Sequence, residues 1–354
     1  MIIRINKKII SENSPTYFIA DIAANHDGSI LRAKKLIKLA SRAGANAAKF
    51  QHFKADTIIN KEQFDKKKKT AHQSKWKSSV YEVYKKASIN HQWNNELRKE
   101  CKKYNIDFLT SPYDLNYVDT VNKFIPAYKI GSGDITWKEI LIKISKKNKP
   151  VILATGASEF NEVVNAVKTI RKFNKRIVLM QCNTNYTGNI QNYNFTNLNV
   201  LKLYKKYFKK KVILGLSDHT PGHTTVLGAI CFGAKVIEKH FTDDNSRDGP
   251  DHKFSMNPTD WKKMIIESRN LENALGDGNK KIEKNEKETS LIQRRGVYAS
   301  RNIKKGEFLK DEMIICLRPK ILNSISPYEI EKFLGKKLKK NIYQYEVISK
   351  KCMI

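Results

Sequence analysis

The sequence predicts an α/β fold in which a (β/α)8 barrel, the TIM-barrel architecture, is followed by a small β-rich domain. Short apolar runs alternate with amphipathic segments from residue 17 to about 275, and there are eight such runs. The runs are continuously apolar, which is typical of parallel strands covered on both faces. A doubly wound sheet is the alternative, but no glycine-rich dinucleotide-binding motif follows the first run.

The predicted elements follow in order along the chain. The first ten residues alternate between apolar and polar types, which predicts a hairpin strand that closes the bottom of the barrel. Most segments between the strands have helical periodicity, and residues 31–44, for example, end at Gly44, a typical helix stop. The predicted strands are residues 17–23, 47–50, 106–110, 127–132, 151–155, 177–182, 212–218 and 236–241.

The chain divides into three predicted parts, a barrel over residues 1–275, a linker over 276–290 and a small domain over 291–354. The linker is charged and nearly devoid of apolar residues. In the small domain, short strand-like pieces are separated by turn sequences such as KKGE. Because so small a domain is only marginally stable alone, we expect it to dock on another surface.

The chain is strongly basic, with 67 Lys+Arg against 35 Asp+Glu and a formal net charge of +32. Such a charge raises a basic nucleic-acid-binding protein as the alternative outside the enzymes. The lysines, however, are spread over predicted helix faces and loops such as residues 66–69, and are not gathered with aromatic residues into one binding element. We therefore expect a solvated basic surface and no nucleic-acid partner.

The cysteines and the apolar runs indicate in which cellular compartment the protein is located. Five cysteines lie far apart without CxxC spacing, which is typical of reduced thiols in a cytoplasm. No apolar run is long enough to span a bilayer, and the first residues lack a signal-peptide pattern. The sequence thus predicts a soluble cytoplasmic protein with no membrane partner.

Polar side chains gather where the predicted strands end, which is where barrel enzymes place their sites. Lys49 and Lys129 lie in the last turns of apolar strands, and a buried lysine is costly without a paired charge. Two of them predict an anionic ligand, most simply one with phosphate and carboxylate groups. The alternative is that either lysine pairs with a barrel carboxylate such as Asp134 or Glu238. Hydroxyl groups at the same rim come from Ser111, Ser132 and Ser217.

His219 and His240 are candidate metal ligands at the ends of two consecutive predicted strands. Glu238, Asp251 and Asp21 are the nearby carboxylates, so the site offers nitrogen and oxygen ligands without a thiolate. Such a set suits Mn²⁺, Mg²⁺ or Zn²⁺. The alternative is that each imidazole is an ordinary core histidine with its hydrogen bonds satisfied.

A metal beside two lysines suits a reaction that forms a carbon–carbon bond. The metal polarises a carbonyl as a Lewis acid, while the lysines hold the carboxylate and phosphate of an enol phosphate. An acidic group near the metal moves protons for the attacking water or the sugar hydroxyls. The same residue types also fit a related metal-dependent barrel aldolase or synthase that uses another aldehyde sugar.

A series of motifs runs in order along the chain: ADIAANHDGS, AAKFQHFKADT, FLTSPYD, PAYKIGSGDI, ATGAS, QCNTNYT, GLSDHTPGH, VIEKHFT and GPDH. With these motifs the chain resembles the sialic acid synthase family, the N-acetylneuraminate synthases with their legionaminate and pseudaminate relatives. The later stretch RRGVYASRNIKKGE resembles the antifreeze-like (SAF) domain that ends these enzymes. The resemblance covers essentially the whole chain.

The resemblance implies a transferase that condenses phosphoenolpyruvate with an open-chain N-acyl hexosamine, giving a nine-carbon 2-keto sugar acid and phosphate. The implied sugar is N-acetylmannosamine or a 2,4-diacetamido-trideoxyhexose, and the implied cofactor is Mn²⁺ or Mg²⁺ on His219 and His240. The implied enol-phosphate ligands are Lys49, Lys129, Ser132, Ser111 and Ser217. The implied sugar contacts are Gln51, Thr184, Tyr186, Asp251 and Arg295. The implied catalytic groups are Asp21, Lys49, Lys129 and Glu238.

The resemblance also implies a domain-swapped homodimer. In the family, the small domain swaps onto the neighbouring subunit, where an arginine closes the partner's site. Arg294 and Arg295 both fall in the matching motif, and we favour Arg295 because it directly precedes the GVYAS strand.

The chain departs from the family pattern at several positions. Asp21 stands where the family usually has Glu, which retracts the carboxylate by about 1.3–1.5 Å and requires a bridging water or a shifted substrate. Ala154 stands at a position that is often Ser, and the NTNY sequence leaves Thr184, Asn183 or Asn185 in place of an asparagine. These changes bear on the identity of the sugar, not on the reaction.

Overall fold

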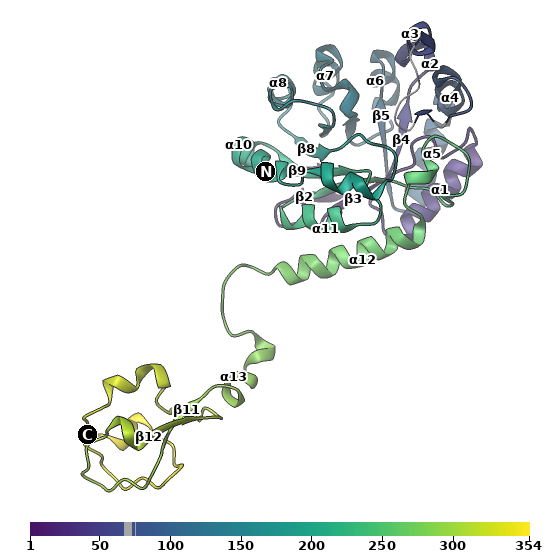
Figure 1. The fold of residues 1–354 in the computed structure, drawn as a ribbon. Coiled ribbons are helices and arrows are strands. Elements are labelled where there is room, and N and C mark those ends of the chain that lie inside the picture. The colour runs from purple at the N-terminus through teal and green to yellow at the C-terminus, as the bar shows by residue number, and fades with distance from the viewer. Residues whose placement is uncertain (67–72, 75) are drawn as a thin grey trace. The chain divides into compact units, whose positions relative to one another are not determined.

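The computed structural model describes residues 1–66, 73–74 and 76–354, and its ribbon is drawn in Figure 1. The predicted loop lysines 67–69 lie outside the described residues. The chain forms two compact units, Met1–Gly276 and Asp277–Ile354. Among the described residues, no helix combines the length and the apolar character needed to cross a membrane.

The first unit is a closed barrel of eight parallel strands, which confirms the predicted fold. Successive strands pair with one another, and β10 closes the barrel against β3. All eight predicted strands are present, with ends that differ by one or two residues. The strands are β3 (Tyr17–Asp21), β4 (Ala47–His52), β5 (Asp107–Pro112), β6 (Tyr128–Ile130), β7 (Val151–Ala154), β8 (Ile177–Cys182), β9 (Ile213–Asp218) and β10 (Val236–His240).

Helices follow every strand and cover the outside of the barrel (Figure 1). Helix α1 begins after Ser29, whose side chain accepts from the Arg32 N–H, and ends before Gly44, whose φ of +92° ends the helix as predicted. The helices of this unit are α1 (Ile30–Arg42), α2 (Ala55–Ile58), α3 (Lys61–Lys66), α4 (Val80–Ala87), α5 (Asn94–Lys103), α6 (Leu115–Asn122), α7 (Lys138–Ser145), α8 (Phe160–Arg171), α9 (Tyr193–Thr196), α10 (Val200–Phe208), α11 (Thr224–Cys231) and α12 (Pro258–Leu275).

The predicted hairpin at the start of the chain is also confirmed. Strands β1 (Ile2–Ile5) and β2 (Lys8–Ser11) pair antiparallel. Their side chains Ile3, Ile5 and Ile10 are fully buried in one cluster with barrel residues such as Tyr17 and Val236. These barrel residues lie near the amino ends of their strands, so the hairpin closes that end of the barrel. A separate apolar layer lies between the strands and the helices.

The second unit contains a small antiparallel sheet of β11 (Gly296–Ala299) and β12 (Ile314–Leu317) and the short helix α13 (Thr289–Ile292). It has its own core, which includes Val297, Ile303 and Ile342. Residues 276–289, within the predicted linker, are exposed and contain one short 3-10 turn, Lys284–Glu286.

Candidate active site

A cavity of about 410 Å³ lies at the carboxyl ends of the barrel strands. This volume suits a small-molecule ligand. Because the amino end is closed by the hairpin, the strand ends provide the polar lining, as is usual in barrel enzymes. The predicted site residues that line the cavity are Asp21, Lys49, Gln51, Lys129, Ser132, Tyr186, Ser217, His219, Glu238, His240 and Asp251.

Three predicted residues are not among those that line the cavity. Ser111 is buried on β5, and its hydroxyl has no hydrogen-bond partner among the described residues. Thr184 packs against Gly156, where an added Cβ would lie 2.4 Å from its methyl carbon. Arg295 belongs to the second unit, where its guanidinium donates to the Cys316 carbonyl at 2.6 Å.

The two buried lysines form a chain of alternating charges with two carboxylates. Lys49 Nζ lies 2.7 Å from Asp21 Oδ2 and 3.9 Å from Glu238 Oε2. Lys129 Nζ lies 2.9 Å from Glu238 Oε1, which also accepts from the Ser217 hydroxyl at 3.0 Å. Each lysine thus has a carboxylate partner, which is the alternative that the sequence left open.

The electrostatics of the two carboxylates differ. Burial alone would raise the pKa of Glu238, but Lys129 and Lys49 lower it to about 2. Burial raises the pKa of Asp21, and the nearby Lys49 only partly offsets this. Glu238 is therefore the fixed anion of the chain, while Asp21 is the carboxylate better suited to take up a proton.

His219 and His240 lie side by side in the lining of the same cavity, with ring centroids 5.4 Å apart. Burial lowers the pKa of both imidazoles to about 3, so they are neutral at pH 7. His219 Nδ1 lies 2.7 Å from the Asn183 carbonyl, which only accepts, so this nitrogen carries the proton and Nε2 keeps a lone pair. His240 Nδ1 is buried and has no hydrogen-bond partner among the described residues.

These donors fit a divalent metal in an open site. Two neutral imidazoles supply nitrogen ligands, and His240 Nε2 lies 3.5 Å from Asp21 Oδ2, so a carboxylate is adjacent. Across the described residues, no group of three or more His, Cys, Asp or Glu side chains is arranged to hold a metal ion. A metal on this pair would therefore take its remaining ligands from substrate and water.

A buried ion pair holds together the two strands that bear the histidines. Asp218 on β9 and Lys239 on β10 are register partners, and Lys239 Nζ lies 2.5 Å from Asp218 Oδ2. Asp218 also accepts from Thr220 and Thr225, so its carboxylate has several partners. Asp218 directly precedes His219, and Lys239 directly precedes His240, so the ion pair joins the backbone segments that carry the two imidazoles.

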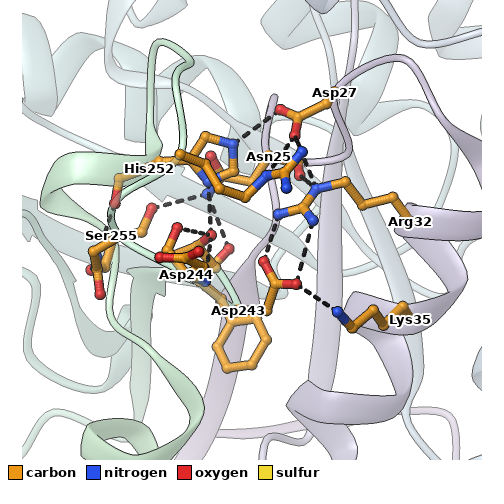
Figure 2. Close-up of polar contacts among 12 residues, drawn as sticks. Asn25, Asp27, Arg32, Lys35, Asp243, Asp244, His252 and Ser255 are labelled. Atoms are coloured by element: carbon orange, nitrogen blue, oxygen red, sulfur yellow. Dashed lines mark hydrogen bonds and ion pairs between the residues drawn. The ribbon is translucent and has the colours of Figure 1, made fainter.

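A polar network fixes the loop that follows β10, and Figure 2 shows its members. Asp27 lies 2.9 Å from both Arg32 Nε and His252 Nε2, and Arg32 also pairs with Asp243. The network joins the loop after β3 to residues 243–252. Within that loop, Asp251 Oδ2 accepts from the Ala24 N–H at 3.2 Å, and burial raises the pKa of Asp251 to about 6.

The apolar part of the cavity lining was not predicted from the sequence. Phe53, Ile58, Val83, Tyr84 and Ala87 line the cavity and come from the long connection between β4 and α5. Helix α4 carries Val83, Tyr84 and Ala87 at a spacing that is equally typical of a core-facing helix. The sequence therefore held no signal that separates the two roles.

Similarities to known proteins agree with this geometry. The NeuB family model matches residues 36–280, and the SAF domain model matches residues 294–352. The chain is 38% identical to the N,N'-diacetyllegionaminic acid synthase of Campylobacter jejuni, over 94% of this chain and 98% of that protein. It is 33% identical to the pseudaminic acid synthase of the same species, over 92% and 93% of the two chains.

The fold is also similar to that of a synthase whose structure has been solved. The crystal structure of the N-acetylneuraminic acid synthetase of Leptospira borgpetersenii superposes with a TM-score of 0.71 at 27% identity, covering 82% of this chain and 95% of that one. The fold and its strand-end cavity thus define an eight-stranded barrel enzyme with a terminal SAF domain. The chain belongs to the NeuB family, and the predicted resemblance is confirmed.

Proposed function

We propose that this enzyme condenses phosphoenolpyruvate with the open-chain form of an N-acyl hexosamine. The methylene carbon of phosphoenolpyruvate forms a bond to the sugar aldehyde carbon, and the aldehyde oxygen takes up a proton to become a hydroxyl. Water adds to the carbon that bears the phosphate, and that carbon then expels inorganic phosphate to leave the 2-keto group. The product is a nine-carbon 2-keto sugar acid. The observation that carries the proposal is the adjacency, in one cavity, of two neutral histidines and a buried lysine–carboxylate chain in a member of the NeuB family.

Lys49 and Lys129 bind the carboxylate and phosphate groups of the enol phosphate. Both are almost fully buried, with 1% and 3% of their surfaces exposed, so a charge-assisted hydrogen bond there is strong. Ser132 and Ser217 add hydroxyl donors from the cavity lining, and the unpartnered hydroxyl of Ser111 lies buried on the neighbouring β5. Glu238 lies 3.9 Å from the Lys49 ammonium group and 2.9 Å from that of Lys129, and so holds the two lysine side chains in place.

His219 and His240 hold a divalent ion, Mn²⁺ or Mg²⁺, which supplies Lewis-acid polarisation of the aldehyde carbonyl when bound. Asp21 moves protons for the attacking water, since its pKa is raised by burial. Gln51, Tyr186 and Asp251 contact the sugar.

The test is phosphate release from phosphoenolpyruvate by chelator-stripped protein with Mn²⁺ restored. We expect release only when both metal and an N-acyl sugar are present. The His240→Ala variant should lose metal-dependent turnover, while circular dichroism stays unchanged. Consumption of phosphoenolpyruvate and sugar without phosphate release would favour an aldolase, and absence of any turnover would contradict the proposal.

We further propose that the enzyme is a cytoplasmic homodimer in which Arg295 of one subunit completes the site of the other. The support is the SAF match that begins at residue 294 and the small core of the second unit. Mixing two inactive variants, His240→Ala and Arg295→Ala, tests this directly. Activity should reappear in mixed dimers. In such a dimer, the subunit that carries Arg295→Ala keeps its own His240 and receives an intact Arg295 from the His240→Ala subunit. Arg294→Ala is the matched control, and a mixture that stays inactive contradicts action between subunits.

A further inference from the structure

One region of the cavity lining is apolar, and we call it the apolar wall: Phe53, Ile58, Val83, Tyr84 and Ala87. Ile58 and Tyr84 pack against a small core of Phe53, Ala87 and Ala24, and the Phe53 and Tyr84 rings are 5.4 Å apart. Val83 joins them in the cavity lining. Trp76 also lines the cavity from the same connection. Among the described residues of this connection that line the cavity, the side-chain polar atoms are those of Tyr84 and Trp76.

Under the proposed function, most of the polar residues in the lining bind the enol phosphate, the metal ion or the aldehyde end of the sugar. The enol phosphate occupies Lys49 and Lys129, and the aldehyde end of the sugar lies by His219 and His240. The acceptor carbons farthest from the aldehyde must then extend along the remaining lining, which includes the apolar wall. Free hydroxyls on those carbons would lose water without gaining a hydrogen bond from Val83, Ala87 or Ile58.

Resting on the proposed function, we infer that the acceptor sugar carries a methyl group at C6 and an acylamino group at C4, where a simple N-acyl hexosamine carries hydroxyls. The apolar wall selects such a sugar because methyl groups are stabilised by contact with Phe53, Val83 and Ala87. The 6-deoxy, doubly N-acylated hexoses have this chemistry. N-Acetylmannosamine instead presents hydroxyls at the same carbons.

The first experiment compares the two sugar classes on the full-length protein with Mn²⁺ and phosphoenolpyruvate. The probes are 2,4-diacetamido-2,4,6-trideoxymannose and N-acetylmannosamine, with phosphate release as the readout. We expect kcat/KM to favour the trideoxy sugar by about 10- to 100-fold, the range in which an apolar pocket rejects a hydroxyl. Equal values, or preference for N-acetylmannosamine, would overturn the inference while leaving the proposed function intact. No release with either sugar would overturn both.

The second experiment changes the apolar wall itself. Val83→Thr keeps the shape of the side chain and adds a hydroxyl, so the preference ratio should narrow by about three- to tenfold, the factor for one neutral hydrogen bond. Val80→Thr is the matched control, since Val80 lies on the same helix α4 but is buried outside the cavity lining. Ala87→Ser serves as a second test if Val83→Thr is poorly folded. Equal changes for both sugars in both wall variants would overturn the role of the wall.

Discussion

At the scale of single residues, the lysine–carboxylate chain determines how an anion binds. Lys129 and Glu238 are each more than nine-tenths buried and lie 2.9 Å apart. An incoming anion must therefore compete with Glu238 for the ammonium group, and removing the ammonium leaves Glu238 without its nearest countercharge.

Lys129→Met should raise the apparent KM for phosphoenolpyruvate by at least about tenfold, because a buried charged hydrogen bond is lost. The KM for the sugar should change far less, since the residues proposed to contact the sugar are Gln51, Tyr186 and Asp251 and do not include Lys129. Steady-state kinetics with each substrate varied in turn measures both values. Lys143→Met, at a partly exposed pair with Asp119, is the control. Equal effects on both substrates would contradict the assignment of Lys129.

His52 makes stability depend on pH. It is buried between Thr110 and Asn94, each 2.7 Å away, and burial lowers its pKa from 6.5 to about 4. Between pH 6.5 and 4 the unfolded chain therefore binds a proton that the folded chain does not, so stability falls as the pH falls through this window. Protonation of this one residue lowers the free energy of unfolding by about 3 kcal/mol as the pH falls through this window.

We expect His52→Gln to flatten the dependence of the free energy of unfolding on pH between 4 and 6.5, as measured by urea titration at several pH values. His91→Gln, at an exposed position, is the matched control. An unchanged slope in His52→Gln would show that the pKa of this imidazole is the same in the folded and the unfolded chain, and would contradict the prediction.

Much of the site could be predicted from single residues, because parallel strands bring their polar ends to one edge. Asp21, Lys49, His219 and His240 line the cavity for this reason. Thr184 does not, since its position depends on packing against Gly156, which no local pattern records. The pairing of Lys129 with Glu238 depends on side-chain reach across the barrel, and so the sequence left it open.

At the scale of elements, the buried pair Asp218–Lys239 joins strands β9 and β10. Lys239→Met should destabilise the protein by about 3–5 kcal/mol, because it leaves the Asp218 carboxylate buried and without its countercharge. The double variant Asp218→Asn with Lys239→Met should recover much of this loss. Urea unfolding gives both free energies.

The metal affinity of the double variant separates a positioning role from a purely structural one. If the ion pair positions His219 and His240, the double variant should regain stability but bind Mn²⁺ more weakly. Recovery of both properties would contradict a positioning role. The partly exposed pair Lys143–Asp119 is a control, since breaking it should cost at most about 1 kcal/mol.

The strands and most helices could be predicted because their periodicity is local. The network of Asp27, Arg32, Asp243 and His252 could not, since it joins residues more than 200 positions apart in the chain. Its geometry follows from barrel closure, which brings the loop after β10 beside the loop after β3. Figure 2 shows how these side chains converge from the two loops and from helix α1, which carries Arg32.

At the scale of the whole molecule, each of the two units has its own apolar core. A chain that ends at Gly276 should therefore fold as a barrel with a cooperative thermal transition. It should lose most turnover, because Arg295 is absent. Thermal unfolding and phosphate release measure the two properties, and addition of the separate second unit in trans is the control. Full activity of the shortened chain would contradict a role for Arg295.

The hairpin of β1 and β2 has a kinetic consequence. Because Ile3, Ile5 and Ile10 close the amino end of the barrel, ligands reach Lys49 and Lys129 only from the carboxyl end. On the proposed function, the enol phosphate bound at Lys49 and Lys129 must enter before the sugar, and the sugar acid obstructs the exit of phosphate. We therefore expect a compulsory order of substrate addition, which initial-rate and product-inhibition patterns would reveal.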